Sequence, residues 1–200
     1  MDAKAISRWG KKVFYAYSLA AHPMFAAVAA VAALYFFPVA ASGLSLKHEL
    51  LAGVVLLVAI PFALLYESVA AGQATINLET RGERARFFLP WTAMFLFAAF
   101  FFNYFATYPH AALSLSLSLC TLFLHFSNRW GKVSWHTTGL AAILSLLSFY
   151  YGALPAAAFL VVLPSVAFAR WKLGAHTPIE LAVGAAAGAL ASALALQLFG

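Results

Sequence analysis

Long apolar runs separated by short polar segments dominate the pattern of hydrophobic and polar positions along the chain. A helix needs about 20 predominantly apolar residues to cross the roughly 30 Å hydrocarbon core of a bilayer. The apolar stretch 87–126 is too long for one crossing and is broken at Tyr108-Pro109-His110, which predicts a helical hairpin of two spans. Further spans are predicted at 17–41, 50–71, 135–151, from the turn at Gly152 and Pro155 to about Ala169, and at 178–199.

Composition supports the same class of protein. The chain is 64% hydrophobic and only 9% charged, whereas a soluble domain is typically about 45–50% apolar and about 25% charged. This excludes a soluble domain and a disordered chain, and the single Cys120 excludes a disulfide scaffold. Because the apolar residues form long runs rather than alternating, a transmembrane barrel is disfavoured. We expect an all-α, polytopic transmembrane bundle of six to seven spans that forms one domain over 1–200 and inserts without a cleaved signal.

The charge distribution predicts an orientation. Twelve Lys and Arg stand against six Asp and Glu, for a net charge of +6. Because two spans separate each from the next, the N-terminal segment and the polar segments 73–86, 127–134 and 170–177 should share one face. That face collects Lys4, Arg8, Lys11, Lys12, Arg81, Arg84, Arg86, Arg129, Lys132, Arg170 and Lys172, and Lys47 falls on the other. The positive-inside rule makes this face cytoplasmic. We expect the membrane to be the plasma membrane of a prokaryote, and residues 1–16 to form an interfacial helix.

Candidate chemistry begins around the last basic segment. His176 and Glu180 are four residues apart, on one face if a helix begins near His176. A carboxylate at that spacing can accept a hydrogen bond from one imidazole nitrogen, which makes the other nitrogen the nucleophile. Arg170 offers a guanidinium that can bind a phosphate through two parallel donors. The alternative interpretation is structural: His176 and Glu180 would be a polar pair at the membrane interface, and Arg170 a positive charge that fixes the orientation of the chain.

Two other polar segments carry matching groups. Ser134 and His136 stand where the fifth span begins, and a helix N-terminus presents free N–H groups to an anion. Lys132 can add its ammonium, and His136 can donate a proton; alternatively, Ser134 is simply a helix cap and His136 an interfacial side chain. The segment before the third span supplies Arg81, Arg84 and Arg86.

In order and spacing, these segments resemble the three motifs of the membrane-bound type 2 phosphatidic acid phosphatases, the lipid phosphate phosphatases. The third motif, S-R-x5-H-x3-D, appears as Ala169-Arg170-x5-His176-x3-Glu180. The second, P-S-G-H, appears as Val133-Ser134-Trp135-His136. The first, K-x6-R-P, is the most degenerate: Arg84-Ala85 stands for R-P and Asn77 for Lys, with Arg81 or Arg86 as a replacement cation. The resemblance covers about 77–200, the motif-bearing part of the chain.

The resemblance implies a role for each matched residue. His176 resembles the nucleophile that forms a phosphohistidine, Glu180 its orienting carboxylate, and His136 the general acid. Arg84, Ser134 and Arg170, with Lys132 and Arg81 nearby, resemble the groups that bind the phosphate. The family needs no metal or other cofactor. The implied activity is hydrolysis of a lipid phosphomonoester or diphosphate, such as an isoprenyl diphosphate or a phosphatidic acid, at the membrane interface.

Two other classes of function stay open. A lipid phosphotransferase on the same scaffold would pass the phosphoryl group to an acceptor hydroxyl, and a non-catalytic relative would bind lipid only. The expected partners are a lipid phosphate and the bilayer, without nucleic acid; the oligomeric state is left open. His22, His48 and His110 fall away from the motifs. Trp135, in place of Gly, is expected beside the pocket or in the interface, and the Phe-rich stretch 95–105 is expected to face lipid, to pack, or to line a groove for a lipid chain.

Overall fold

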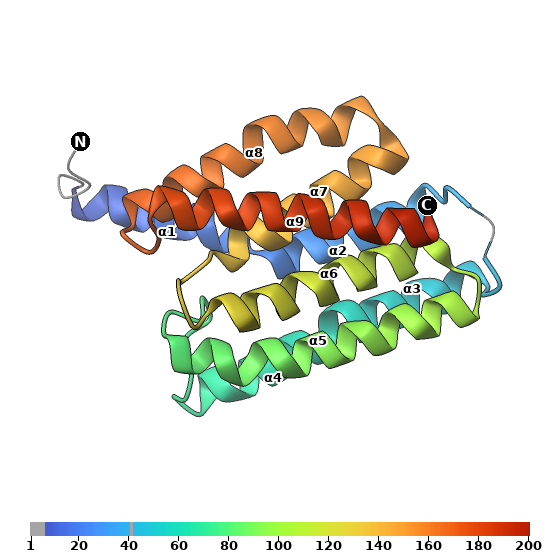
Figure 1. The fold of residues 1–200 in the computed structure, drawn as a ribbon, viewed down its shortest axis with the longest axis horizontal. Coiled ribbons are helices and arrows are strands. Elements are labelled where there is room, and N and C mark those ends of the chain that lie inside the picture. The colour runs from blue at the N-terminus through green and yellow to red at the C-terminus, as the bar shows by residue number, and fades with distance from the viewer. Residues whose placement is uncertain (1–6, 41) are drawn as a thin grey trace.

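A computed structural model describes residues 7–40 and 42–200 of the chain, and every regular element in that part is helical (Figure 1). Lys4 and Ala41 lie outside the described residues. The elements are α1 (Arg8–Ala20), α2 (Pro23–Phe36), α3 (Leu46–Val54), η1 (Val55–Ala59), α4 (Ile60–Ala70), α5 (Arg81–Tyr104), α6 (Tyr108–Ser127), α7 (Trp135–Tyr151), α8 (Ala153–Lys172) and α9 (Pro178–Phe199).

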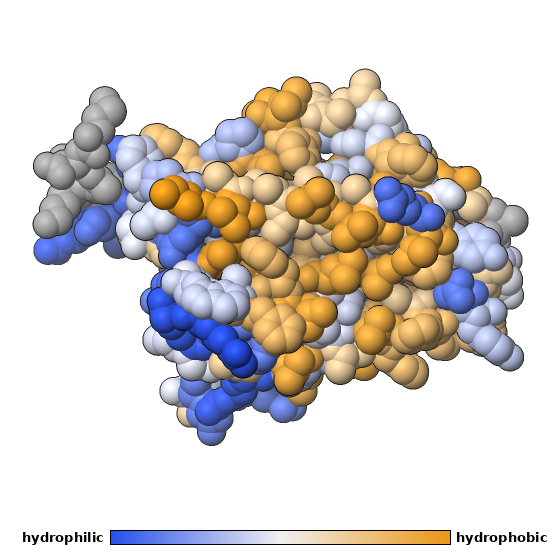
Figure 2. Space-filling view, viewed as in Figure 1, coloured by the Kyte–Doolittle hydropathy of each residue, from blue (hydrophilic) through white to orange (hydrophobic). Residues whose placement is uncertain are grey.

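Six helical segments in the described part are long and apolar enough to cross a membrane, which confirms the expected all-helical architecture and agrees with the expectation of a membrane protein. They are Arg8–Phe36, Leu46–Ala70, Arg81–Tyr104, Tyr108–Ser127, Ala153–Lys172 and Pro178–Phe199. The 17-residue α7 runs among them. Figure 2 shows a surface whose hydrophobic residues cover the middle and whose hydrophilic residues gather mainly at one end.

The helices run back and forth, so that alternate connections lie at the same end of the bundle (Figure 1). The α4–α5, α6–α7 and α8–α9 connections meet at the end from which α1 extends. Direct contacts join them: the Asn128 side chain donates to the carbonyl of Arg81, and the backbone N–H of Ser134 donates to the carbonyl of Glu180. The three polar segments therefore converge, as the span count predicts.

Several charged residues that we expected in loops belong to helices. α5 begins at Arg81 rather than near Phe87, and α8 continues to Lys172 rather than ending near Ala169. Thr80 and Glu83 form a capping box that starts α5 early. Arg84 and Arg170 consequently stand on rigid helix ends, which fixes their positions better than a loop would.

The N-terminal boundary also differs from the expectation. α1 extends to Ala20, beyond the predicted interfacial segment 1–16, and the chain breaks at His22-Pro23 before α2. His22 caps α2, since its Nδ1 accepts the N–H of Met24 at 3.3 Å. α1 packs on α8, with the rings of Phe14 and Phe168 edge to face at 5.9 Å. The first helix is therefore part of the bundle.

Close packing of α9 on α7 brings the last two motifs together. Gly184 and Gly188 face α7, and a Cβ at Gly188 would fall on the carbonyl oxygen of Thr138. The GxxxG spacing therefore does what it predicts, which is to let two helix backbones approach closely. This contact places the start of α9, with Glu180, beside the start of α7, with Ser134 and His136.

Candidate active site

Arg84 reaches from α5 into the interior at the convergent end of the bundle. Its side chain is 2% exposed, and it donates from Nε to the Leu78 carbonyl at 2.8 Å and from Nη1 to the Val133 carbonyl at 2.9 Å. These bonds tie the first motif to the segment that carries the second. A guanidinium has five N–H donors, so Arg84 keeps donors for a ligand while two hold it in place.

Arg170 enters the same region from the last turn of α8. It is 2% exposed, its Nη1 donates to the Ser18 hydroxyl at 3.2 Å, and its Nε has no hydrogen-bond partner among the described residues. Ser18 belongs to α1, a helix to which the sequence assigned no role in the site. The sequence could not have predicted this contact, because a single serine in an apolar segment is compatible with many structural roles.

His176 is oriented by a backbone carbonyl. Its Nδ1 lies 2.7 Å from the carbonyl oxygen of Lys132, but 3.8 Å from Oε2 of Glu180. A carbonyl only accepts, so Nδ1 carries the proton and Nε2 keeps its lone pair. The ring is buried, and its Nε2 has no partner among the described residues. The contact with the Lys132 carbonyl thus leaves Nε2 as the ring nitrogen with a free lone pair.

Glu180 influences His176 indirectly, through the backbone of Lys132. The direct hydrogen bond that we expected between Glu180 and His176 is therefore corrected. Oε1 of Glu180 accepts the backbone N–H of Lys132 at 2.9 Å, and its Oε2 accepts that of Thr177 at 2.9 Å within the capping box of α9. Both carboxylate oxygens are therefore engaged by backbone donors. Glu180 fixes the Lys132 backbone, whose carbonyl in turn holds His176.

His136 and Ser134 lie at the start of α7. Ser134 is fully buried and caps the helix, its Oγ accepting the N–H of Thr137 at 3.4 Å, so the cap reading holds. His136 is 1% exposed, and its Nε2 has no partner in the described part of the chain.

His22 belongs to the site, and our expectation that it falls away from the motifs was wrong. Its ring stands edge to face with that of His136, with centroids 4.9 Å apart. Because its Nδ1 accepts the Met24 N–H, its Nε2 carries the proton in the neutral ring. The break between α1 and α2 places this ring, and sequence spacing gives no sign of it. His48 and His110 do lie elsewhere: His110 is paired with Glu49 at 2.9 Å, and His48 with Ser45 at 2.6 Å.

Cations outnumber anions where these side chains meet. Burial, together with the nearby guanidinium groups of Arg84 and Arg170, lowers the pKa of Lys132. Burial and the same two guanidinium groups lower the pKa of His176 from 6.5 to about 3, so its ring is neutral at neutral pH. Positive charges held together at buried and half-buried positions favour an anion beside them.

Other predicted residues lie to the side. Arg81 is exposed and reaches Asn128 through its backbone, and Arg86 is exposed and donates to Gln73 at 3.0 Å, so neither side chain fills the place of the missing Lys. Asn77, at that place, is buried, and its Oδ1 lacks a partner among the described residues. Trp135 packs in the core rather than beside the pocket or in the interface, with its ring 6.1 Å from that of Trp91.

The described side chains include no group of three or more His, Cys, Asp and Glu that would hold a metal ion. No family model, curated protein or solved structure matches the chain.

Proposed function

We propose that the protein is an integral-membrane lipid phosphatase that hydrolyses a lipid phosphomonoester or diphosphate through a phosphohistidine on His176. The observation that carries the proposal is a set of three buried polar atoms without partners among the described residues: Nε2 of His176, Nε2 of His136 and Nε of Arg170. Buried polar atoms normally find hydrogen-bond partners. An anion with several acceptor oxygens, bound between these groups and Arg84, would satisfy them together.

Phosphoryl transfer asks for three functions at such a site. Arg84, Arg170 and Lys132 neutralise the equatorial oxygens, whose charge the transition state redistributes. The Nε2 lone pair of His176 attacks phosphorus, because Nδ1 is committed to the Lys132 carbonyl at 2.7 Å. A neutral imidazole is the nucleophilic form, and the pKa of about 3 keeps His176 in that form before the substrate binds.

The two steps then balance. In the first, the N–P bond forms and the bond between phosphorus and the leaving oxygen breaks, while His136, whose protonated form the bound anion favours, gives its proton to that oxygen. In the second, neutral His136 takes a proton from water, the resulting hydroxide equivalent attacks phosphorus, and the N–P bond breaks. His176 returns to its neutral form and inorganic phosphate leaves. An alcohol in place of water would make the enzyme a phosphotransferase.

The basic end of the bundle is the end we assign to the cytoplasm. The lipid phosphate would then be reached from the cytoplasmic leaflet, with its chain remaining in the bilayer. This assignment favours substrates made on that side, such as isoprenyl diphosphates or phosphatidic acid.

Phosphate release from dioleoyl phosphatidic acid and farnesyl diphosphate in detergent tests the proposal. We expect turnover by the wild type, and a loss of roughly a thousandfold or more in His176→Ala, because the nucleophile is gone. His48→Ala is the matched control, since His48 lies at the opposite end, bonded to Ser45. Equal rates for His176→Ala and the wild type would refute the proposal, as would inactivity of the wild type on both lipids. Product analysis with an added alcohol separates a phosphatase from a phosphotransferase.

A further inference from the structure

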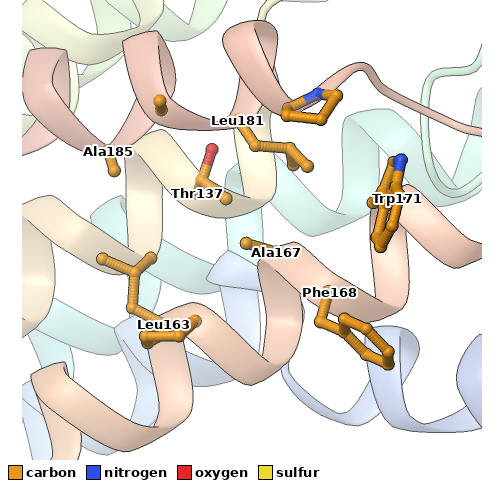
Figure 3. Close-up of a pocket in the computed structure, with 10 residues that line it drawn as sticks. Thr137, Leu163, Ala167, Phe168, Trp171, Leu181 and Ala185 are labelled. Atoms are coloured by element: carbon orange, nitrogen blue, oxygen red, sulfur yellow. The ribbon is translucent and has the colours of Figure 1, made fainter. Parts of the chain in front are cut away.

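An apolar groove lies between α8 and α9 (Figure 3). It has a volume of about 490 Å³, in the range typical of ligand sites. Leu163, Phe168 and Trp171 of α8 face Leu181 and Ala185 of α9 across it. Its polar lining residue is Thr137, whose hydroxyl donates to the Ser134 carbonyl at 3.2 Å, so the groove offers little to a polar ligand.

The groove adjoins a smaller and more polar pocket at one end of α9. Trp171 and Pro178 line both the apolar groove and a second pocket that contains His176 and Glu180. Near this junction, the Lys172 ammonium lies 4.8 Å from the centre of the Trp171 ring. One end of the groove thus lies near a cation and adjoins the pocket that contains the proposed nucleophile, while the rest of the lining is mostly apolar.

Two other apolar grooves of the molecule lack this connection. One is lined by α1, α2, α7 and α8, and another by α3, η1 and α5, and neither shares a lining residue with the polar pocket. The second of these includes Phe97 and Phe101. Two residues of the Phe-rich stretch 95–105 therefore line a groove, while Phe95 and Phe102 pack in the core, and this groove shares no residue with the pocket of His176.

We propose that the α8–α9 groove binds one hydrocarbon chain of the lipid whose phosphate lies against His176. The inference rests on the proposed function and adds the path by which the substrate enters. From Trp171 to Leu163 the groove follows α8 for roughly 12 Å at about 1.5 Å per residue. Since the hydrocarbon core is about 30 Å thick, this length lets a chain run from the basic end well into the bilayer without leaving it. The lipid enters sideways, between the two helices.

Filling the groove with a larger side chain should weaken activity on a lipid substrate but not on a water-soluble one. Ala182 is exposed and lines the groove, so Ala182→Phe would occupy the space of the chain. Val183→Phe is the matched control: Val183 is 40% exposed, is not among the lining residues, and points about 100° further around α9. We expect Ala182→Phe to raise the KM for dioleoyl phosphatidic acid by roughly tenfold, because several methylenes lose their buried site. Hydrolysis of p-nitrophenyl phosphate should stay within about twofold in both variants.

The outcomes separate the two proposals. A wild type inactive on every phosphate overturns the proposed function. An active wild type whose KM values for phosphatidic acid are equal in Ala182→Phe and Val183→Phe overturns the groove alone. So does an equal loss of activity on both substrates in Ala182→Phe.

A binding measurement needs no turnover. Cys120 is buried, so in His176→Ala protein a cysteine at position 182 or 183 is the accessible thiol. We expect dioleoyl phosphatidic acid to slow alkylation of Ala182→Cys but not of Val183→Cys, and to do so at lower concentration than dioleoyl phosphatidylcholine. Equal protection by the two lipids would show a site for bulk lipid and would overturn the proposal.

Discussion

Shortening the side chain of Glu180 distinguishes two ways in which the proposed nucleophile, His176, could be oriented. In Glu180→Asp, the carboxylate withdraws by about 1.5 Å, the length of one C–C bond. Oε1 now accepts the Lys132 N–H at 2.9 Å, and the withdrawal takes that bond beyond hydrogen-bonding distance. If Glu180 works through the Lys132 backbone, the loop holding the Lys132 carbonyl loosens and His176 loses its orientation. If instead a carboxylate must touch His176 directly, the aspartate found in the resembling family should serve at least as well.

The size of the effect follows from the bond that is lost. A hydrogen bond to a charged group contributes about 1.5–3 kcal/mol, and Lys132 is half-buried, so water recovers part of this. We expect Glu180→Asp to lower the free energy of unfolding by about 1–2 kcal/mol, or the Tm by about 2–8 °C for a chain of this size. The turnover rate should fall by roughly tenfold or more, because small misplacements of a reacting group are costly.

Glu83→Asp is the matched control for this experiment. Glu83 occupies the same position in the capping box of α5, where its Oε2 accepts the Thr80 N–H at 3.3 Å, and its oxygens do not contact the Lys132 backbone. Its shortening should lower the Tm to a similar extent while leaving turnover unchanged. The assay is thermal unfolding in detergent beside phosphate release from dioleoyl phosphatidic acid. Wild-type turnover in Glu180→Asp, at any Tm, would refute the orientation by the Lys132 backbone.

Four further expectations follow from individual contacts. Ser18→Ala removes the hydroxyl that holds Arg170 at 3.2 Å, and KM for a lipid phosphate should rise about fivefold, equivalent to about 1 kcal/mol; an unchanged KM contradicts the contact. His22→Asn keeps an acceptor for the cap of α2 but loses the ring at 4.9 Å from His136, so it should shift the pH profile of turnover without the loss of Tm expected for His22→Ala. Because His176 has a pKa of about 3 when folded and 6.5 when unfolded, the unfolded state binds more protons between these values, and stability should fall as pH drops through this window, less so in His176→Gln; parallel curves contradict it. A cysteine at the exposed Trp130 in the α6–α7 connection should react with an impermeant maleimide only after the membrane is opened, and labelling of intact cells would reverse the assigned orientation.

The sequence predicts the helical bundle and the convergence of three polar segments because both depend on local features. Apolar run length sets the spans, and counting them sets the end at which each connection lies. The GxxxG spacing also predicts close helix packing correctly, since Gly184 and Gly188 allow the close approach of α7.

The rest depends on three-dimensional contacts that spacing does not encode. The i,i+4 spacing of His176 and Glu180 allowed a direct bond, but two backbone donors compete for the carboxylate, and one of them is on the distant Lys132. Ser18 and His22 reach the site because α1 packs on α8 and the chain breaks at His22-Pro23. The start of α5 could not be predicted from the length of the apolar run, because a capping box followed by arginines has the composition of a polar loop.

The most direct test of the account is to trap the covalent intermediate. Purified protein is mixed with dioleoyl phosphatidic acid labelled with ³²P, quenched in base to preserve phosphoramidate bonds, and digested for mass spectrometry. We expect an acid-labile phosphoryl group on Nε2 of His176, absent in His176→Ala and retained in His48→Ala. Label on another residue, or full turnover without any labelled protein in a quench faster than the turnover time, would contradict it.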